Sequence, residues 1–347
     1  MTTVQLPGAS AASAALARRL RAVATLGGLV ALAAGGFVWS VSIGPEHIGL
    51  WTIVKGTFAQ GHDTKQLIVH LIRLPRALLA VLAGGTLAVS GAVMQSLTRN
   101  PLGAPDVLGV TSGAAVTVAI ASTIVPSLGG ISTIFLSFAG ASVASALVFG
   151  IARFGRGGLS PVRLALAGVT ISLLLYALMQ GILIAFTQNA ELFFFWLVGG
   201  VTYAQWHDIH LAFPWMAAGL ALAMLLARRL NVLALGDDVA RGLGQNVSRT
   251  RLLSVVCVVL LAGAAVGVAG PVAFLALVVP NIVRRLVGHN HFVVLPACMV
   301  AGAALLLYAD VASRYLNPHV ETPAGVVVAP IGATVFVYLA RREKLAG

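Results

Sequence analysis

The stretch LPRALLAVLAGGTLAVSGAVMQSLT occupies residues 74 to 98 and contains one charged residue, Arg76. A helix crosses the hydrocarbon core of a membrane with about 20 mostly apolar residues, because each residue adds about 1.5 Å. This stretch is long enough to span. Nine further apolar stretches meet or approach that length, near residues 22 to 42, 105 to 125, 131 to 152, 164 to 187, 211 to 227, 252 to 269, 271 to 283, 293 to 310 and 325 to 340. The sequence therefore predicts an all-α membrane protein with about ten transmembrane helices.

The composition excludes an ordinary soluble protein. Of 347 residues, 59% are apolar and 9% are charged, against about half and about a quarter in a typical soluble domain. The net charge of +12 does not favour nucleic-acid binding, because the basic residues lie between apolar runs rather than on one water-facing patch. Cys257 and Cys298 lie inside apolar runs and are expected to pack in the core, while His289 and His291 are expected in a solvated loop. No metal site is predicted.

The distribution of Lys and Arg predicts the orientation. If the N-terminus is inside, all but five of the 22 Lys and Arg residues lie on the inner side. The five exceptions are Lys55, Lys65, Arg73, Arg76 and Arg314. Because Lys and Arg are enriched in cytoplasmic loops, we expect both termini of a ten-span chain in the cytoplasm. The intervening stretches are short, so residues 1–347 form one domain, with a cytoplasmic N-terminal segment at 1–21.

An internal repeat relates the two halves of the chain. Residues 82 to 93 read LAGGTLAVSGAV and residues 261 to 272 read LAGAAVGVAGPV, with six of twelve positions identical. The first copy would enter the membrane from outside and the second from inside, which predicts an inverted five-helix repeat, as in many transporters. Chance similarity in Ala/Gly/Val-rich sequence is the alternative. Gly270-Pro271 interrupts the second copy, and such a break either lines a path or is a packing kink.

The chain is not expected to be an enzyme. A phosphate-binding loop needs a lysine directly after a glycine, and none of Lys55, Lys65 and Lys344 follows one. Energy from ATP would have to come from a partner. Ionisable residues inside the spans would indicate ion coupling. Asp310 and Asp106 lie near predicted helix ends, where helix capping explains them, so an ion-coupled secondary transporter is the less favoured alternative.

Two polar regions are candidates for partner binding. Arg73 and Arg76 flank Leu74-Pro75 on the predicted outer side, where they either contact lipid headgroups or receive an acidic partner. Residues 228 to 250, on the inner side, mix apolar and charged side chains. Asp237 and Asp238 can cap a short helix there. We favour docking of a partner on this element over simple association with the membrane surface.

Five motifs identify a family resemblance. They are IRLPR at 72 to 76, SGAVMQSLTRNPLGAPDVLGVTSGA at 90 to 114, LSPVRLALAG at 159 to 168, LALGDDVARGLG at 233 to 244 and GPVAFLALVVPNIVR at 270 to 284. Over nearly its whole length the chain resembles the FecCD-type permeases of bacterial ATP-binding-cassette (ABC) importers for iron siderophores, haem and vitamin B12. The resemblance implies a second permease subunit, identical or paralogous, two cytoplasmic ATPase subunits that bind ATP and Mg, and a periplasmic or lipoprotein binding protein.

The resemblance also implies roles for particular residues. It implies that the binding protein docks on Arg73, Arg76 and Arg314. Coupling to the ATPase falls to Leu233, Leu235, Gly236, Asp237, Asp238, Arg241, Leu243 and Gly244. The cytoplasmic gate maps to Asn100, Leu102, Ser160 and Pro161, and candidate polar path-lining residues are Thr170, Ser172, Tyr176 and Gln180. The expected function is ATP-driven import of a ferric siderophore across the bacterial inner membrane. Haem or vitamin B12 import and a membrane receptor or scaffold remain alternatives.

Overall fold

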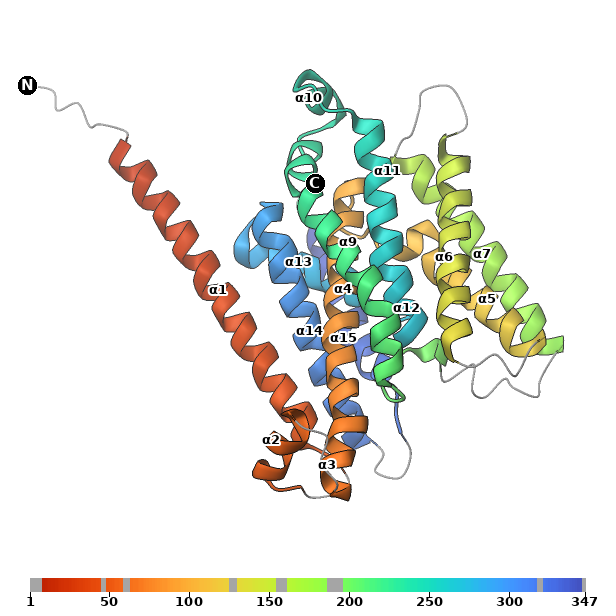
Figure 1. Cartoon of the computed structure of the whole chain (residues 1–347). Helices are drawn as coiled ribbons and strands as arrows, with labels where there is room; N and C mark the ends of the chain where they lie inside the picture. The colour runs from red at the N-terminus through yellow and green to blue at the C-terminus, as the bar shows by residue number, and fades with distance from the viewer. Residues whose placement is uncertain are drawn as a thin grey trace, which may run out of the picture.

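The computed structural model describes residues 8–44, 48–58, 63–124, 130–153, 161–185, 196–316 and 321–344. Every regular element within these residues is a helix (Figure 1). The elements are α1 (Gly8–Ser42), α2 (Leu50–Phe58), α3 (Thr64–Ile68), η1 (Val69–Arg73), α4 (Leu74–Thr98), η2 (Pro105–Leu108), α5 (Val110–Ile124), α6 (Gly130–Arg153), α7 (Pro161–Ala185), α9 (Trp206–Leu233), α10 (Asp237–Gly242), α11 (Val247–Val258), η4 (Val259–Gly263), α12 (Ala264–Ala269), α13 (Leu275–Val287), α14 (His291–Leu316) and α15 (Gly325–Lys344).

The prediction of an all-helical membrane protein is confirmed. Each of the ten predicted stretches contains helix in the described part of the chain, although residues 271–274 are not helical. Seven helices there are long and apolar enough to cross a membrane, and α5, α13 and α15 are shorter. The helix α1 begins at Gly8, so it takes in most of the segment predicted as 1–21. Alanine occurs repeatedly between Gly8 and Arg21 and has the highest helix propensity, which explains the extension.

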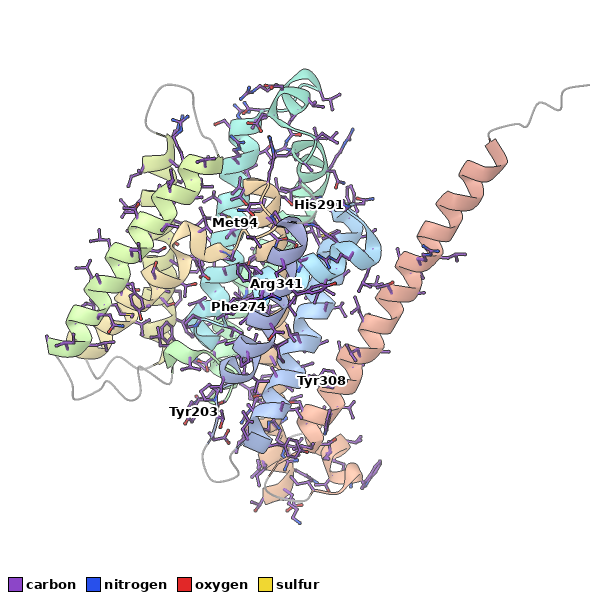
Figure 2. All side chains as sticks on the ribbon, turned by 180° about the vertical axis from the view of Figure 1, so that it is seen from behind. Met94, Tyr203, Phe274, His291, Tyr308 and Arg341 are labelled. Atoms are coloured by element: carbon purple, nitrogen blue, oxygen red, sulfur yellow. The ribbon has the colours of Figure 1, made fainter. Side chains whose placement is uncertain are left out.

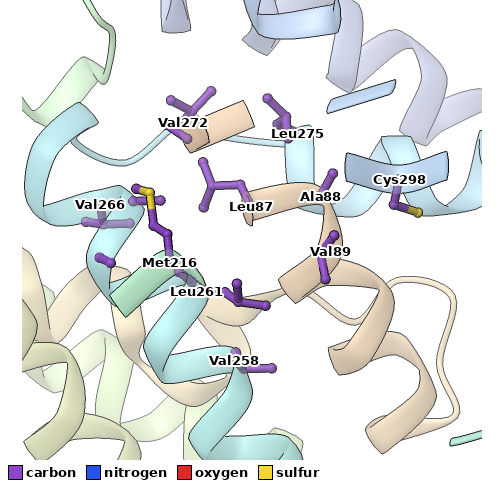
Figure 3. Packing of buried hydrophobic residues seen from close by; sticks show 14 of the residues in the cluster. Leu87, Ala88, Val89, Met216, Val258, Leu261, Val266, Val272, Leu275 and Cys298 are labelled. Carbon is purple, nitrogen blue, oxygen red and sulfur yellow. The ribbon is translucent and has the colours of Figure 1, made fainter. Parts of the chain in front are cut away.

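The helix α4 forms the centre of the molecule. All of its residues except Leu78, Val81 and Leu82 are buried, and α14, α13, α9, α11 and α12 pack around it. Figure 3 shows Leu87 and Val89 of α4 beside Met216 of α9 and Leu261 of η4. The close packing depends on glycine. A Cβ on Gly84 would lie 2.4 Å from the Gly302 carbonyl oxygen of α14, so only glycine allows these two backbones to approach.

The remaining long helices lie on two sides of this centre. In Figure 1, α5, α6 and α7 form one group beside α11 and α12, and α1 runs obliquely on the opposite side. The helix α1 packs against α14, and α5 packs against both α6 and α7. The start of α1 lies towards the same end of the molecule as α10, whereas α2 and α3 lie at the other end.

The predicted break in the second repeat copy is confirmed. The helix α12 ends at Ala269, Gly270 adopts a φ of 64°, and α13 begins only at Leu275. The two copies run in opposite directions. Arg99, directly after α4, contacts Asp237 of α10, while α11 starts near α10 and runs away from it. This arrangement agrees with an inverted relation between the copies.

Candidate functional site

Three arginines meet where α1 and α14 end and α4 begins, at the side that the charge pattern places outside. We call Arg73, Arg76 and Arg314 the arginine cluster. Arg76 Nε donates to Asp310 Oδ1 at 2.9 Å, and Arg314 Nη2 donates to Asp310 Oδ2 at 2.6 Å. Asp310 is completely buried. Residues far apart in the sequence are therefore brought together around one buried carboxylate.

The arginine cluster also caps the last turn of α1. Arg73 Nη1 donates to the Val41 and Ser42 carbonyls at 3.2 Å and 2.8 Å. Arg314 Nη1 donates to the Ser40 carbonyl at 2.8 Å. The last carbonyls of a helix have no partner within the helix, and a cation beside them is favourable. The cluster thus joins the ends of three helices.

Burial limits what the arginine cluster can offer a partner. Arg73 and Arg76 are 4% and 5% exposed. Arg76 Nη1 donates to Glu321 Oε2 at 3.0 Å, and the Glu321 side chain is 52% exposed. Among the described residues, Arg76 Nη2 and Arg314 Nε are buried without a hydrogen-bond partner. Unused donors therefore remain beside an accessible carboxylate, and docking at this cluster stays a prediction.

The expectation that Asp310 caps a helix end is wrong. The helix α14 continues to Leu316, so Asp310 lies more than one turn inside it. Its carboxylate neutralises Arg76 and Arg314 instead. A buried charge is tolerated when it is paired and hydrogen-bonded, and both conditions are met here.

The expectation that His291 lies in a solvated loop is also wrong. His291 is the first residue of α14 and is 2% exposed (Figure 2). Its Nε2 lies 2.6 Å from Ser96 Oγ of α4, and its Nδ1 lies 2.7 Å from Asn231 Oδ1 of α9. His289 is exposed, as expected. Partners on two other helices remove His291 from solvent.

Two of the four predicted gate residues, Asn100 and Leu102, lie on the connection between α4 and η2. Asn100 Oδ1 accepts from the Leu102 amide at 2.8 Å, which closes a tight turn. Asn281 Nδ2 of α13 donates to the Pro101 carbonyl at 2.8 Å. We call residues 100–102 the gate loop. Of the other two gate candidates, Ser160 lies outside the described residues, and Pro161 begins α7.

The predicted coupling element forms a short helix, α10, at the end of the molecule (Figure 1). Leu235, Val239 and Leu243 are 64%, 48% and 66% exposed. Leu233 and Ala240 are completely buried and hold the element against the bundle. Gly236 and Gly244 adopt φ values of 116° and 78°, which glycine reaches without strain.

The two aspartates of α10 have different surroundings. The Asp238 side chain is 98% exposed and contacts Arg241 at 3.3 Å. The Asp237 side chain is 22% exposed, accepts from Arg251 Nη2 at 2.9 Å and also accepts from Arg99 Nη2. Sequence reasoning did not identify Arg99 and Arg251 as partners. Their positive charges were visible, but their proximity to Asp237 depends on the tertiary fold.

The predicted path-lining residues lie on α7, the least buried of the long helices after α1. Only 17% of its apolar window is buried in this chain. Thr170 Oγ1 donates to the Leu166 carbonyl of its own helix at 2.9 Å, and Ser172 Oγ donates to the Asp106 carbonyl at 3.2 Å. Tyr176 is 52% exposed, and Gln180 is half-buried. Their role in a path stays a prediction.

Comparison with known proteins places this arrangement in a family. The model of the FecCD transport family matches residues 31–342. The iron(3+)-hydroxamate import system permease protein FhuB of Bacillus subtilis (strain 168) is 44% identical, over 93% of this chain and 84% of that protein. The Fe(3+) dicitrate transport system permease protein FecC of Escherichia coli (strain K12) is 40% identical, over 80% of this chain and 84% of that protein.

A solved structure shares the fold. It is described as an inward-facing conformation of a transporter of the metal-chelate ABC type. Its TM-score is 0.81 at 28% sequence identity, and the match covers 91% of this chain and 98% of the other. The match to the family model over most of the chain, together with these relatives, shows that this chain belongs to the FecCD transport family.

Proposed function

We propose that this chain is the membrane permease subunit of a binding-protein-dependent ABC importer that carries a ferric siderophore across the bacterial inner membrane. The observation that carries the proposal is 44% identity, over 93% of the chain, to a permease named for iron(3+)-hydroxamate import. A second relative is named for Fe(3+) dicitrate transport. Both names describe ferric chelates, so the substrate class follows from them rather than from any single side chain.

The proposed assembly contains more than this chain. This chain has ten spans and both termini in the cytoplasm, and a second permease subunit lies beside it. The sparsely buried α7 leaves surface for contact with lipid or with that second subunit. ATP and Mg bind the partner ATPases, and the exposed Leu235, Val239 and Leu243 provide an apolar surface on which an ATPase can dock. The transport step is conformational, with alternation between outward-open and inward-open states.

The proposed external partner is an acidic surface of the binding protein. A carboxylate of the binding protein would displace Glu321 from Arg76 Nη1, because Arg76 Nη2 is buried, and guanidinium groups pair well with carboxylates. The variant Arg76→Lys keeps a positive charge near Asp310 but loses the planar guanidinium, which can donate to two carboxylates at once. We expect it to lower the affinity for the binding protein several-fold. Lys65→Gln, at an exposed outer position, is the control. Unchanged affinity in Arg76→Lys would refute this docking site.

The decisive experiment is uptake into liposomes that contain this chain, its ATPase and its binding protein. Labelled ferric hydroxamate siderophore, ferric citrate, haem and cobalamin are offered in parallel. We expect accumulation of the ferric siderophore only, abolished when ATP or the binding protein is left out. Accumulation of haem or cobalamin instead would reassign the substrate. Uptake driven by an ion gradient without ATP would replace the ABC mechanism with secondary transport.

A further inference from the structure

Asp237 joins the exposed coupling helix to the body of the protein. It is the first residue of α10, and its carboxylate binds Arg251 of α11 and Arg99 at the end of α4. Asp238, the next residue, has a nearly fully exposed side chain and contacts only Arg241 of the same helix in the part of the chain that the structure describes. Two adjacent carboxylates thus face different environments, and only the first links separate elements.

Arg99 has an unusual backbone conformation. It caps the C-terminal end of α4 with φ 49° and ψ 36°, in the left-handed region that non-glycine residues rarely occupy. Such a conformation persists when surrounding contacts hold it. The contact with Asp237 holds the side chain, and the Arg99 amide donates to the Gln95 carbonyl. The position of Arg99 therefore depends on where α10 lies.

The gate loop follows Arg99 directly and is held at several points. The Asn100 amide donates to the Gln95 carbonyl at 3.2 Å, and the Gly103 amide donates to the Asn100 carbonyl at 2.9 Å. The hydrogen bond from Asn281 to the Pro101 carbonyl connects the loop to α13. A tightly bonded loop moves as a unit with the residue that precedes it, so a displacement of Arg99 reaches residues 100–102 and α13.

We infer that Asp237 is a positioning residue, which transmits displacement of α10 through Arg99 to the gate loop. The inference rests on the proposed function and adds the route by which ATPase movement reaches the gate. The Asp237 carboxylate acts within this chain, and the apolar side chains of α10 form the surface for the ATPase. Arg251 Nη2 donates to both oxygens of the same carboxylate, at 3.0 Å and 2.9 Å, so that a displacement of α10 is passed on to Arg99 rather than absorbed by rotation of the Asp237 side chain.

The first test measures the link without any transport. Hydrogen–deuterium exchange is followed at the amides of Leu102 and Gly103 in the purified full chain. We expect Asp237→Asn and Arg99→Gln to speed this exchange at least tenfold, because the loop loses its anchor. Asp238→Asn, on the same helix, should leave the exchange unchanged. Equal exchange in wild type and Asp237→Asn would overturn the inference, whatever the protein transports.

The second test measures coupling in the full complex. Two quantities are measured for each variant: the amount of ferric siderophore taken up per ATP hydrolysed, and the amount of ATPase that co-purifies with the permease. We expect Asp237→Asn and Arg99→Gln to retain the ATPase and ATP hydrolysis but to lose at least tenfold in uptake per ATP. Arg99→Lys, which keeps a cation beside Asp237, should recover part of the loss. Arg285→Gln, at an exposed position on α13, is the matched control.

Each outcome separates the inference from the proposed function. If the wild-type complex transports and the Asp237→Asn variant transports equally well per ATP hydrolysed, the link through Asp237 is refuted but the proposed function is not. Loss of the ATPase from Asp237→Asn would also refute it, because the residue would then belong to the docking surface. A wild-type complex without ATP-dependent uptake of any ferric chelate would refute the proposed function, while the exchange experiment would still decide the link.

Discussion

At the scale of single residues, Asp310 has the largest predicted effect on stability. It is completely buried and neutralises both Arg76 and Arg314. Breaking a buried ion pair by removing one partner costs about 3 to 5 kcal/mol, because a charge is left buried without compensation. We therefore expect Asp310→Asn to lower the free energy of unfolding by about that amount. Thermal or denaturant unfolding in detergent measures the difference.

The matched control for Asp310 is Glu321, which pairs with the same Arg76. Its side chain is 52% exposed, and an exposed ion pair contributes about 0 to 1 kcal/mol. Glu321→Gln should therefore unfold close to wild type. If Asp310→Asn and Glu321→Gln were equally stable, the buried carboxylate would not hold the cluster together.

The sequence predicted the location of these residues better than their environment. Arg73 and Arg76 were predicted on the outer side of the membrane, which requires only the distribution of Lys and Arg along the chain. Asp310 and His291 each have a partner on α4, Arg76 and Ser96, that lies 234 and 195 positions away in the sequence, respectively. Hydropathy places both residues near the end of an apolar run, where capping or solvation is the simpler reading. Only the packing of α4 against α14 reveals the buried contacts.

At the scale of elements, the contact between α4 and α13 depends on Gly91. A Cβ at this position would lie 1.7 Å from the Ala276 carbonyl oxygen, which is backbone and cannot rotate away. Overpacking of a core typically costs about 1 to 3 kcal/mol. We expect Gly91→Ala to destabilise the protein by at least the upper part of that range, as measured by the unfolding temperature of the detergent-solubilised chain.

The control for Gly91 is Gly181 on α7. A Cβ there would meet nothing within 4 Å. Replacement of glycine by alanine within an open helix gains about 0.5 to 1 kcal/mol, because the unfolded chain loses conformational freedom. Gly181→Ala should therefore unfold at or slightly above the wild-type temperature. Equal losses in the two variants would show that helix backbone freedom, rather than the approach of α4 and α13, governs the effect.

The coupling helix presents leucines for a partner. Leu235 and Leu243 are 64% and 66% exposed, which is costly unless another surface covers them. Burial of one leucine contributes about 2 kcal/mol, or about thirtyfold in affinity. We expect Leu235→Ser or Leu243→Ser to weaken ATPase binding by about tenfold or more without a change in unfolding temperature. Leu286→Ser, exposed on α13, is the control, and equal binding in all three variants would contradict the assignment.

The apolar character of this element was predicted from its leucines and valines, but which of these side chains are buried and which are exposed was not predicted. Leu233 packs inward with Ala240, whereas Leu235 and Val239 point to solvent. A six-residue helix between two glycines with positive φ has too few turns for its periodicity to define a buried face. The relation of Asp237 to Arg99 and Arg251 was equally hidden, because it requires the ends of three helices to meet.

At the scale of the whole molecule, the helical character of each apolar run was easier to predict than the number of spans. Within the described residues each of the ten apolar runs contains helix, since each is apolar enough to disfavour other structures. The helix α13 is short because Gly270 and the four residues after it are not helical. The sequence showed the Gly270-Pro271 interruption but not how much helix it removes. A short helix can still complete a span when neighbouring helices surround its ends.

The orientation in the membrane is the last prediction, and labelling of introduced cysteines tests it. The native Cys257 and Cys298 are both buried, so they leave little background labelling. Lys65 lies on the α2 and α3 side, and Asp238 lies on the α10 side with a 98% exposed side chain. Because Lys and Arg gather on the α10 side, that side should be cytoplasmic. We expect an impermeant maleimide to label Lys65→Cys in intact spheroplasts and Asp238→Cys only after lysis. The reverse pattern would invert the topology, and it would place the arginine cluster on the cytoplasmic side and the coupling helix outside, where no ATPase could reach it.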